Sequence, residues 1–174
     1  ATIREIMGNK AGAATLLYPV TEHPTLRPKE RLSALVTIGD ALTDMGALDS
    51  AELYLDRSLE LSKIWVDSQT LTAIYQSYGN LEFFRDNYEA ALSYYQEGLD
   101  YFPSTMHRSG IPNIINNIGQ IYFFLGQPEE ALAYASEGIA LAQKFQSGFA
   151  YHFGLYVKAQ AQGALGNTAA AIAT

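Results

Sequence analysis

The feature of this 174-residue chain that most restricts its fold is an internal repeat with a period of 40 residues. Three columns of small residues keep one register through the copies. The first column holds Gly39, Gly79, Gly119 and Ala159. The second, seven residues later, holds Gly46, Asp86, Gly126 and Gly166. The third, five residues further on, holds Ala51, Ala91, Ala131 and Ala171. Such a pattern indicates stacked copies that bury their apolar sides against one another.

The residue pattern within each copy predicts two helices joined by a tight turn. Large apolar residues such as Leu35, Ile38 and Leu42 are spaced by three and four, which forms one face of a helix. The glycine and alanine columns fit places where two helices approach closely. Glycine in the second column predicts the end of a helix, because glycine accepts the left-handed conformation found there. We therefore predict an all-α fold.

Two of the copies resemble tetratricopeptide repeats. The matching residues run from Gly79 through residues 87–95 to Pro103, and from Gly119 to Leu132. The resemblance covers about residues 27–174 and implies a right-handed α-solenoid of antiparallel helix pairs. We expect copies at about residues 27–66, 67–106, 107–146 and 147–174, with the last one truncated.

Two departures from the family pattern are informative. The period of 40 exceeds the usual length of about 34 residues, and longer copies of this kind are similar to those of bacterial signalling proteins and kinesin light chains. The aromatic position of the first helix holds Leu42, Glu82, Tyr122 and Gln162. We expect Leu81 and Phe83 to replace Glu82 in packing, with a slightly rotated helix in the second copy.

The two ends of the chain give further expectations. Residues 1–26 predict an N-terminal helix, at about residues 3–18, that forms a degenerate half repeat, followed by a proline-containing linker. Pro28 suits the first turn of the next helix. The fourth copy stops early in its second helix, so we expect the chain to be part of a longer protein. The alternative is that the natural chain stops there.

Composition argues against several kinds of chemistry. With 18 acidic and 11 basic residues the formal charge is −7, which disfavours binding of nucleic acid. The chain has no cysteine, so disulfides and thiolate chemistry are excluded. No apolar run reaches the length of a membrane span, which predicts a soluble segment in either cytoplasm or periplasm. We find no catalytic motif and expect no enzymatic role, metal site or cofactor.

Three isolated features have plain explanations. His23, His107 and His152 lie far apart in the sequence, and although two fall near links between copies, solvated histidines explain them better than a metal site does. The acidic residues Asp40, Asp44 and Asp49 are typical of a solvated helix face. Trp65, in a link, is expected to anchor packing unless it is exposed as a partner surface.

The family resemblance implies a binding groove on the concave face that the first helices line. The predicted groove residues are Gln76, Asn80, Phe83, Phe84, Asn116, Asn117, Gln120, Phe123, Tyr156 and Gln160. Amides can clamp the backbone of an extended peptide, and aromatic rings supply pockets for its side chains. Alternatively, one ring of each phenylalanine pair packs between helices. The groove lacks the lysines and arginines with which family members bind acidic C-terminal tails, and its acidic first copy favours a basic ligand end.

The leading hypothesis is therefore a protein- or peptide-binding repeat module. It would serve as the sensor or scaffold part of a larger bacterial signalling protein, for example upstream of a diguanylate cyclase or kinase. The alternatives are a sensing domain of a transcriptional regulator and a self-associating scaffold that dimerises through residues 164–172. An enzyme or small-ligand binder would need a closed pocket. Neither nucleic acid nor a membrane is expected as a partner of this segment.

Overall fold

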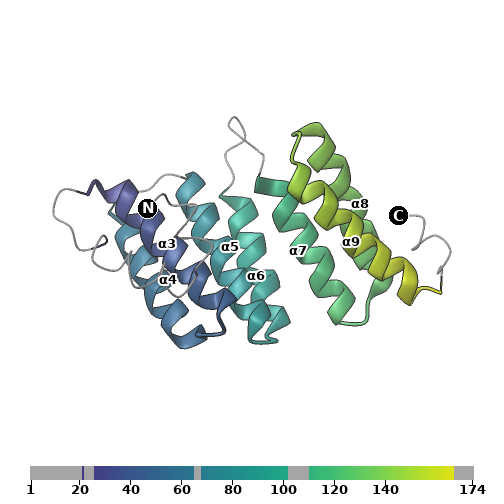
Figure 1. Ribbon diagram of the computed structural model, residues 1–174, viewed down its shortest axis with the longest axis horizontal. Coiled ribbons are helices and arrows are strands. Elements are labelled where there is room, and N and C mark those ends of the chain that lie inside the picture. Colours follow the sequence, from purple (N-terminus) through teal and green to yellow (C-terminus); the bar gives the residue numbers. More distant parts are fainter. Residues whose placement is uncertain (1–20, 22–25, 65–67, 102–109, 167–174) are drawn as a thin grey trace. The chain divides into compact units, whose positions relative to one another are not determined.

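The computed structural model describes Thr21 and residues 26–64, 68–101 and 110–166, and within these residues the elements are α-helices (Figure 1). The all-α repeat fold is thus confirmed. The helices belong to two compact units, Ala1–Tyr101 (unit 1) and Phe102–Thr174 (unit 2). The predictions for the N-terminal helix, Trp65, His23, His107 and the second helix of the last copy concern residues outside the described ones.

The described residues 26–64 and 68–101 of unit 1 form two helix pairs. These helices are α3 (Pro28–Asp44), α4 (Leu48–Ser62), α5 (Ser68–Phe84) and α6 (Tyr88–Asp100). Helix α3 pairs with α4 and α5 pairs with α6, while α5 also packs against both helices of the preceding pair. Ile38, Leu55, Ile74 and Leu81 have no exposed surface and form the centre of this core.

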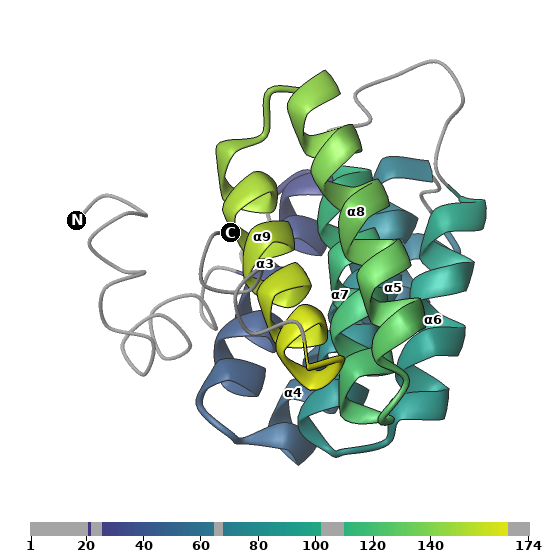
Figure 2. The same ribbon diagram turned by 90° about the vertical axis from the view of Figure 1, so that its right-hand side faces the viewer.

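Unit 2 contains one helix pair and a third helix. Its helices are α7 (Ile111–Phe124), α8 (Pro128–Lys144) and α9 (Gly148–Ala164). Helix α8 packs against both other helices and lies beside α9 in both views (Figures 1 and 2). Pro28 occupies the first turn of α3, as predicted, and Pro128 occupies the first turn of α8. At these positions the missing N–H of proline has no helical partner to lose.

The second column of small residues ends the first helix of each copy. Gly46, Asp86, Gly126 and Gly166 have positive φ angles of 76°, 58°, 73° and 77°. After each of the first three turns, the next backbone N–H donates to a carbonyl five residues back, at 2.9 Å. This hydrogen bond closes the helix end in a Schellman motif. The sequence did not indicate the similar turn at Gln146, which has a φ of 55°.

Asp86 and Gly126 both have a positive φ, so changing the first to glycine and changing the second to alanine should shift the free energy of unfolding in opposite directions. Asp86→Gly should raise the free energy of unfolding by about 0.5 kcal/mol, because it relieves the cost of a side chain in this conformation. Gly126→Ala should lower it by about 1 kcal/mol for the same reason. Urea unfolding of the two single variants measures both values. Changes of the same sign would show that backbone strain does not decide the choice of residue at this column.

The other small columns lie where the helices approach each other. Ala51, Ala91 and Ala131 have no exposed surface. A Cβ atom on Gly39 would come within 2.6 Å of Leu55, and one on Gly79 would come within 2.5 Å of the Tyr95 ring. The close approach predicted from these columns is therefore confirmed.

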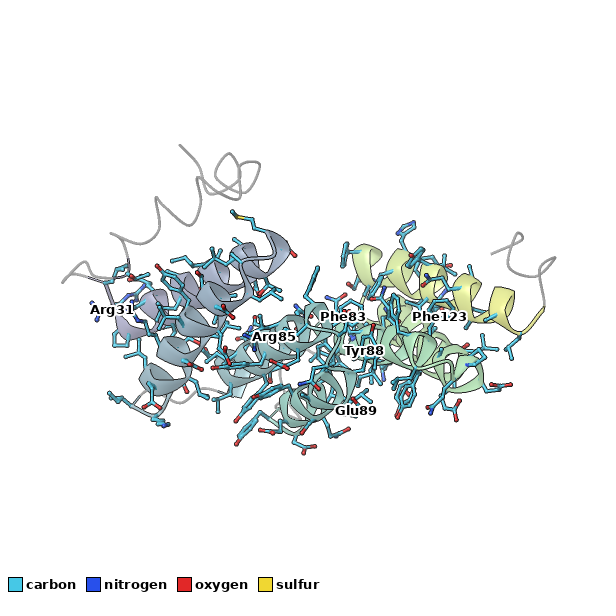
Figure 3. The ribbon with its side chains drawn as sticks, turned by 90° about the horizontal axis from the view of Figure 1, so that it is seen from below. Arg31, Phe83, Arg85, Tyr88, Glu89 and Phe123 are labelled. Carbon is cyan, nitrogen blue, oxygen red and sulfur yellow. The ribbon has the colours of Figure 1, made fainter. Side chains whose placement is uncertain are left out.

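Glu82, the polar residue at the aromatic position of α5, is buried in an ionic network. Its carboxylate accepts hydrogen bonds from Arg85 and Asn87, both at 2.8 Å. Arg85 also donates to Glu52 on α4 at 2.7 Å and lies 3.6 Å from Asp49. The network lies at the end of α5, where Figure 3 labels Arg85. Leu81 is fully buried beside it, whereas the rotation of this helix stays a prediction.

Candidate functional site

Each first helix has a face that points away from its second helix. Gly39, Gly79 and Gly119 face α4, α6 and α8, respectively. Residues two before and five after such a glycine lie on the opposite side of a helix with 3.6 residues per turn. We call this side the open face. Together with the adjoining positions one residue after and six before the first column, it includes Thr37, Asp40, Asp44, Asn80 and Phe84 in unit 1, and Asn113, Asn117, Gln120, Phe124, Phe153 and Gln160 in unit 2.

On α5, one phenylalanine of the pair Phe83 and Phe84 packs against a neighbouring ring, and the other is exposed. Phe84 is 50% exposed and meets Phe83 edge-to-face, with ring centroids 6.0 Å apart. Phe83 is half-buried and lies 5.9 Å from the ring of Tyr88 at the start of α6 (Figure 3). Of these two rings, Phe84 therefore offers the larger apolar surface on the open face of unit 1.

Asn80 is tied to the second helix of its own pair. Its Oδ1 accepts a hydrogen bond of 2.6 Å from the hydroxyl of Tyr95, a residue that is almost completely buried. Gln76, four residues earlier on α5, is half-buried. Gln76 and Asn80 both lie at the edge of the open face of α5, and the hydroxyl of Tyr95 holds Asn80 in one orientation.

Asp40 differs from the solvated residue that the sequence predicted. Its Oδ1 is fully buried and has no hydrogen-bond partner in the described part of the chain. Burial raises the pKa of Asp40 to about 6, a hydrogen bond from Ser77 opposes the rise, and the nearby charge of Asp44 adds to it. The prediction fails because position 40 turns towards α5, which packs against α3. Asp44 and Asp49 are exposed, as expected.

Asn116 was predicted to contact a ligand, and the structure shows that this is wrong. The residue has no exposed surface, and its Nδ2 donates a hydrogen bond of 2.8 Å to the carbonyl of Ala150 on α9. Its amide packs against Gly138 of α8 and Gly154 of α9. A signal for this was present in the sequence, because Gly154 stands where the second and third copies have Ile74 and Ile114.

Amides and one exposed ring remain on the open face of α7. Asn117 and Gln120 are half-buried, and Phe124 is 48% exposed. Phe123 is half-buried and meets Phe124 edge-to-face at 5.7 Å, so this pair divides as the pair on α5 does. The sequence analysis missed Asn113, one turn before Asn117, whose side-chain oxygen is buried without a partner among the described residues.

Helix α9 places its two predicted residues differently. Gln160 lies on the open face, and its Nε2 donates to the hydroxyl of Tyr156 at 3.0 Å. Tyr156 is 54% exposed but stands in the register of Asn116, on the flank of the helix. His152 lies four residues before Tyr156 and contacts the carbonyl of Gly148 through Nδ1 at 2.7 Å. Of the two predicted residues, Gln160 alone belongs to the open face.

The described residues offer little for other chemistry. Within residues 26–64, 68–101 and 110–166, no three His, Asp or Glu side chains come together in a way that could hold a metal ion. No helix in these ranges combines the length and apolar character needed to cross a membrane. The open faces therefore remain the candidate site, and their chemistry is that of hydrogen bonding and apolar contact.

Comparison with known proteins identifies the repeats. The tetratricopeptide repeat model matches residues 32–64 and 112–145. No curated protein sequence matches the chain. The chain is similar to one solved structure with a TM-score of 0.81 and 20% identity. That structure is the Signal Transduction ATPase with Numerous Domains (STAND) protein with a tetratricopeptide repeat sensor from Pyrococcus horikoshii. The alignment covers 97% of this chain and 26% of that one.

Two further structures have the same fold. The Rap conjugation gene regulator of plasmid pLS20, in complex with the Phr* peptide, aligns with a TM-score of 0.70 and 20% identity, over 91% of this chain and 41% of that one. TPR-like repeats assigned to a kinesin light chain of Podosopora anserina align with a TM-score of 0.71 and 17% identity, over 98% and 85%. At these identities the likeness shows the fold alone. The two matched segments fit the tetratricopeptide repeat model, and the helix pairs have the same fold as these structures.

Proposed function

We propose that this chain is a protein-binding module whose open faces hold an extended peptide. The observation that carries the proposal is the exposure of Phe84 and Phe124 beside hydrogen-bonding side chains on first helices. Large exposed aromatic rings next to polar groups are typical of surfaces that bind proteins. The family consists of repeats that stack into extended binding surfaces, which supports the same function.

The finer part of the proposal is a sensor or scaffold role in a larger signalling protein. Two of the similar structures support it, because one contains a tetratricopeptide repeat sensor and the other holds a bound Phr* peptide. The chain spans only 26% and 41% of the lengths of those proteins. An output activity of the whole protein would lie in further domains, and no catalytic role is proposed for the repeats.

A comparison of three serine variants tests the binding function. Phe84→Ser and Phe124→Ser should each weaken partner binding about tenfold, because each removes a large apolar contact. Leu53→Ser is the matched control, since Leu53 is 52% exposed and lies two residues from the buried Ala51, on the outward side of α4. Pull-down from the source cell, followed by titration of a purified partner and of synthetic peptides from it, gives the affinities.

The variants separate the open faces from general surface effects. Binding that persists in Leu53→Ser and weakens in one or both phenylalanine variants supports the proposal. Equal binding by all three folded variants would overturn it, as would equal loss in all three. Circular dichroism melting curves establish that the variants are folded, which is expected because all three side chains are about half exposed.

A further inference from the structure

Within residues 110–166, the open face of unit 2 carries no charged side chain. Helix α7 contains no Asp, Glu, Lys, Arg or His anywhere in Ile111–Phe124. Helix α9 contributes Phe153 and Gln160 to the face. Its one Lys, Lys158, is two residues from Gln160 and so lies on the opposite side of the helix. A charged ligand group on this face would lose water without gaining a partner of opposite charge, which is costly.

Two side-chain carbonyl oxygens near this face lack hydrogen bonds. Oδ1 of Asn113 and Oε1 of Gln160 are fully buried atoms with no partner among the described residues. The nitrogen of the Gln160 amide already donates to Tyr156, so only the Oε1 atom of this side chain still needs a hydrogen-bond donor. An unsatisfied buried acceptor costs about 1–3 kcal/mol. Both side chains are half-buried, so a rotation that turns the carbonyl towards an incoming N–H would recover that energy at Asn113, and at Gln160 to the extent that the exposed Tyr156 hydroxyl follows the amide.

Apolar surface lies next to these acceptors. Phe124 is about half exposed on α7, and Phe153 is half-buried on α9. These rings suit aliphatic or aromatic side chains of a ligand. An extended backbone provides N–H donors together with side chains that alternate in direction, and so fits acceptors and rings on one face. The open face of unit 1 differs, because it includes Asp40 and Asp44.

We infer that unit 2 binds an uncharged, apolar segment of an extended peptide, with backbone N–H groups donated to Asn113 and Gln160. This inference rests on the proposed peptide-binding function and specifies the ligand chemistry at one of the two units. It assigns Asn113 and Gln160 to acceptance of backbone N–H groups, Phe124 and Phe153 to apolar contact, and the selection against charge to the lack of charged side chains on this face.

The probe for the test is a phage-displayed library of random dodecapeptides, selected on the purified 174-residue chain. The selected peptides should contain a run of about four residues without Asp, Glu, Lys or Arg and with apolar residues in alternation. Each peptide is then resynthesised with single N-methyl groups along its backbone. Within the uncharged run, one or two N-methylations should each weaken binding about tenfold, because each removes a donor that the protein requires.

Protein variants show where the uncharged run binds. Gln160→Glu and Asn113→Asp add a negative charge with little change of shape, and each should weaken the selected peptides at least about tenfold. The matched control is Gln143→Glu, at an exposed position of α8, which should leave the affinity unchanged. The N-methyl series uses the unchanged protein, so it decides the question even where a charge variant fails to fold.

The outcomes distinguish this inference from the proposed function. Peptides that bind but carry charges throughout, or that are insensitive to N-methylation and to both charge variants, overturn the inference while leaving peptide binding in place. A library that yields no binding peptide counts against both. Selected uncharged peptides that lose affinity equally in Gln143→Glu also overturn the inference, because the effect would then follow net charge and not the open face.

Discussion

Replacing Gly138 by alanine is expected to destabilise unit 2 by about 3 kcal/mol. The new Cβ atom would lie 2.7 Å from Cγ of Asn116, a residue with no exposed surface. On its other side Asn116 packs against Gly154, and its Nδ2 is bonded to Ala150. To move away, the amide must break that buried hydrogen bond and overpack the junction of three helices. Chemical denaturation monitored by circular dichroism measures the loss.

Two controls test whether Asn116 is the cause. In an Asn116→Ala background, Gly138→Ala should cost less than about 1 kcal/mol, because the clashing amide is gone. Gly163→Ala makes the same chemical change on α9 where no atom lies within 4 Å, and it should stabilise the protein by about 0.5 kcal/mol. If Gly138→Ala were as harmless as Gly163→Ala, the packing of Asn116 described above would be incorrect.

Asp40→Asn is expected to stabilise the protein at neutral pH by about 2–3 kcal/mol. The pKa of Asp40 rises from 3.8 to about 6 on folding, so the folded state binds the proton more tightly than the unfolded chain does. The stability associated with the protonated carboxyl is fully present below about pH 4 and is lost as the pH rises through about 6. Each tenfold difference in proton affinity between the two states corresponds to about 1.4 kcal/mol. Asparagine keeps the shape and a hydrogen-bonding group for Ser77 without the buried charge.

The pH dependence separates this effect from a general surface effect. Unfolding free energies of wild type and Asp40→Asn should converge near about pH 4 and differ most above about pH 7. Asp44→Asn, one turn along the same helix, removes an exposed carboxylate that is only the smallest cause of the raised pKa of Asp40, so it should stabilise the protein by less than about 0.5 kcal/mol at neutral pH. A constant difference between wild type and Asp40→Asn at all pH values would contradict the pKa given for Asp40.

The fold was predictable because the repeat constrains it at several positions at once. The glycine column marks close approach, the second column marks the left-handed turn, and the alanine column marks the buried side of the second helix, as the structure confirms. The turn at Gln146 could not be predicted in this way. Its residue type does not favour a positive φ, and its conformation is imposed by the helices on either side.

The binding face was harder to predict from sequence than the fold. Repeat register gives the side of a helix, but it does not say what covers that side. Asn116 is covered because two glycines on other helices leave room for it, and Asp40 because α5 packs beside it. The remaining predicted groove residues stay predictions, since their roles depend on a ligand. Asn113 was missed because its unmet oxygen is a property of the packed structure.

The ionic contacts between α4 and α5 bear on how an array of this kind can change in length. Tyr78 donates to Asp56 and Arg85 donates to Glu52, and each bond joins residues of successive copies. Forty residues further on, the second helix has Gln96 and Leu92 in place of the two acids, and the next first helix has Ile118 and Leu125 in place of the two donors. A recombination event that duplicated or deleted one copy would therefore bring together donors and acceptors that do not match. The hydrogen bonds between the first two copies therefore depend on side chains that the later copies do not repeat, although the helices themselves are alike.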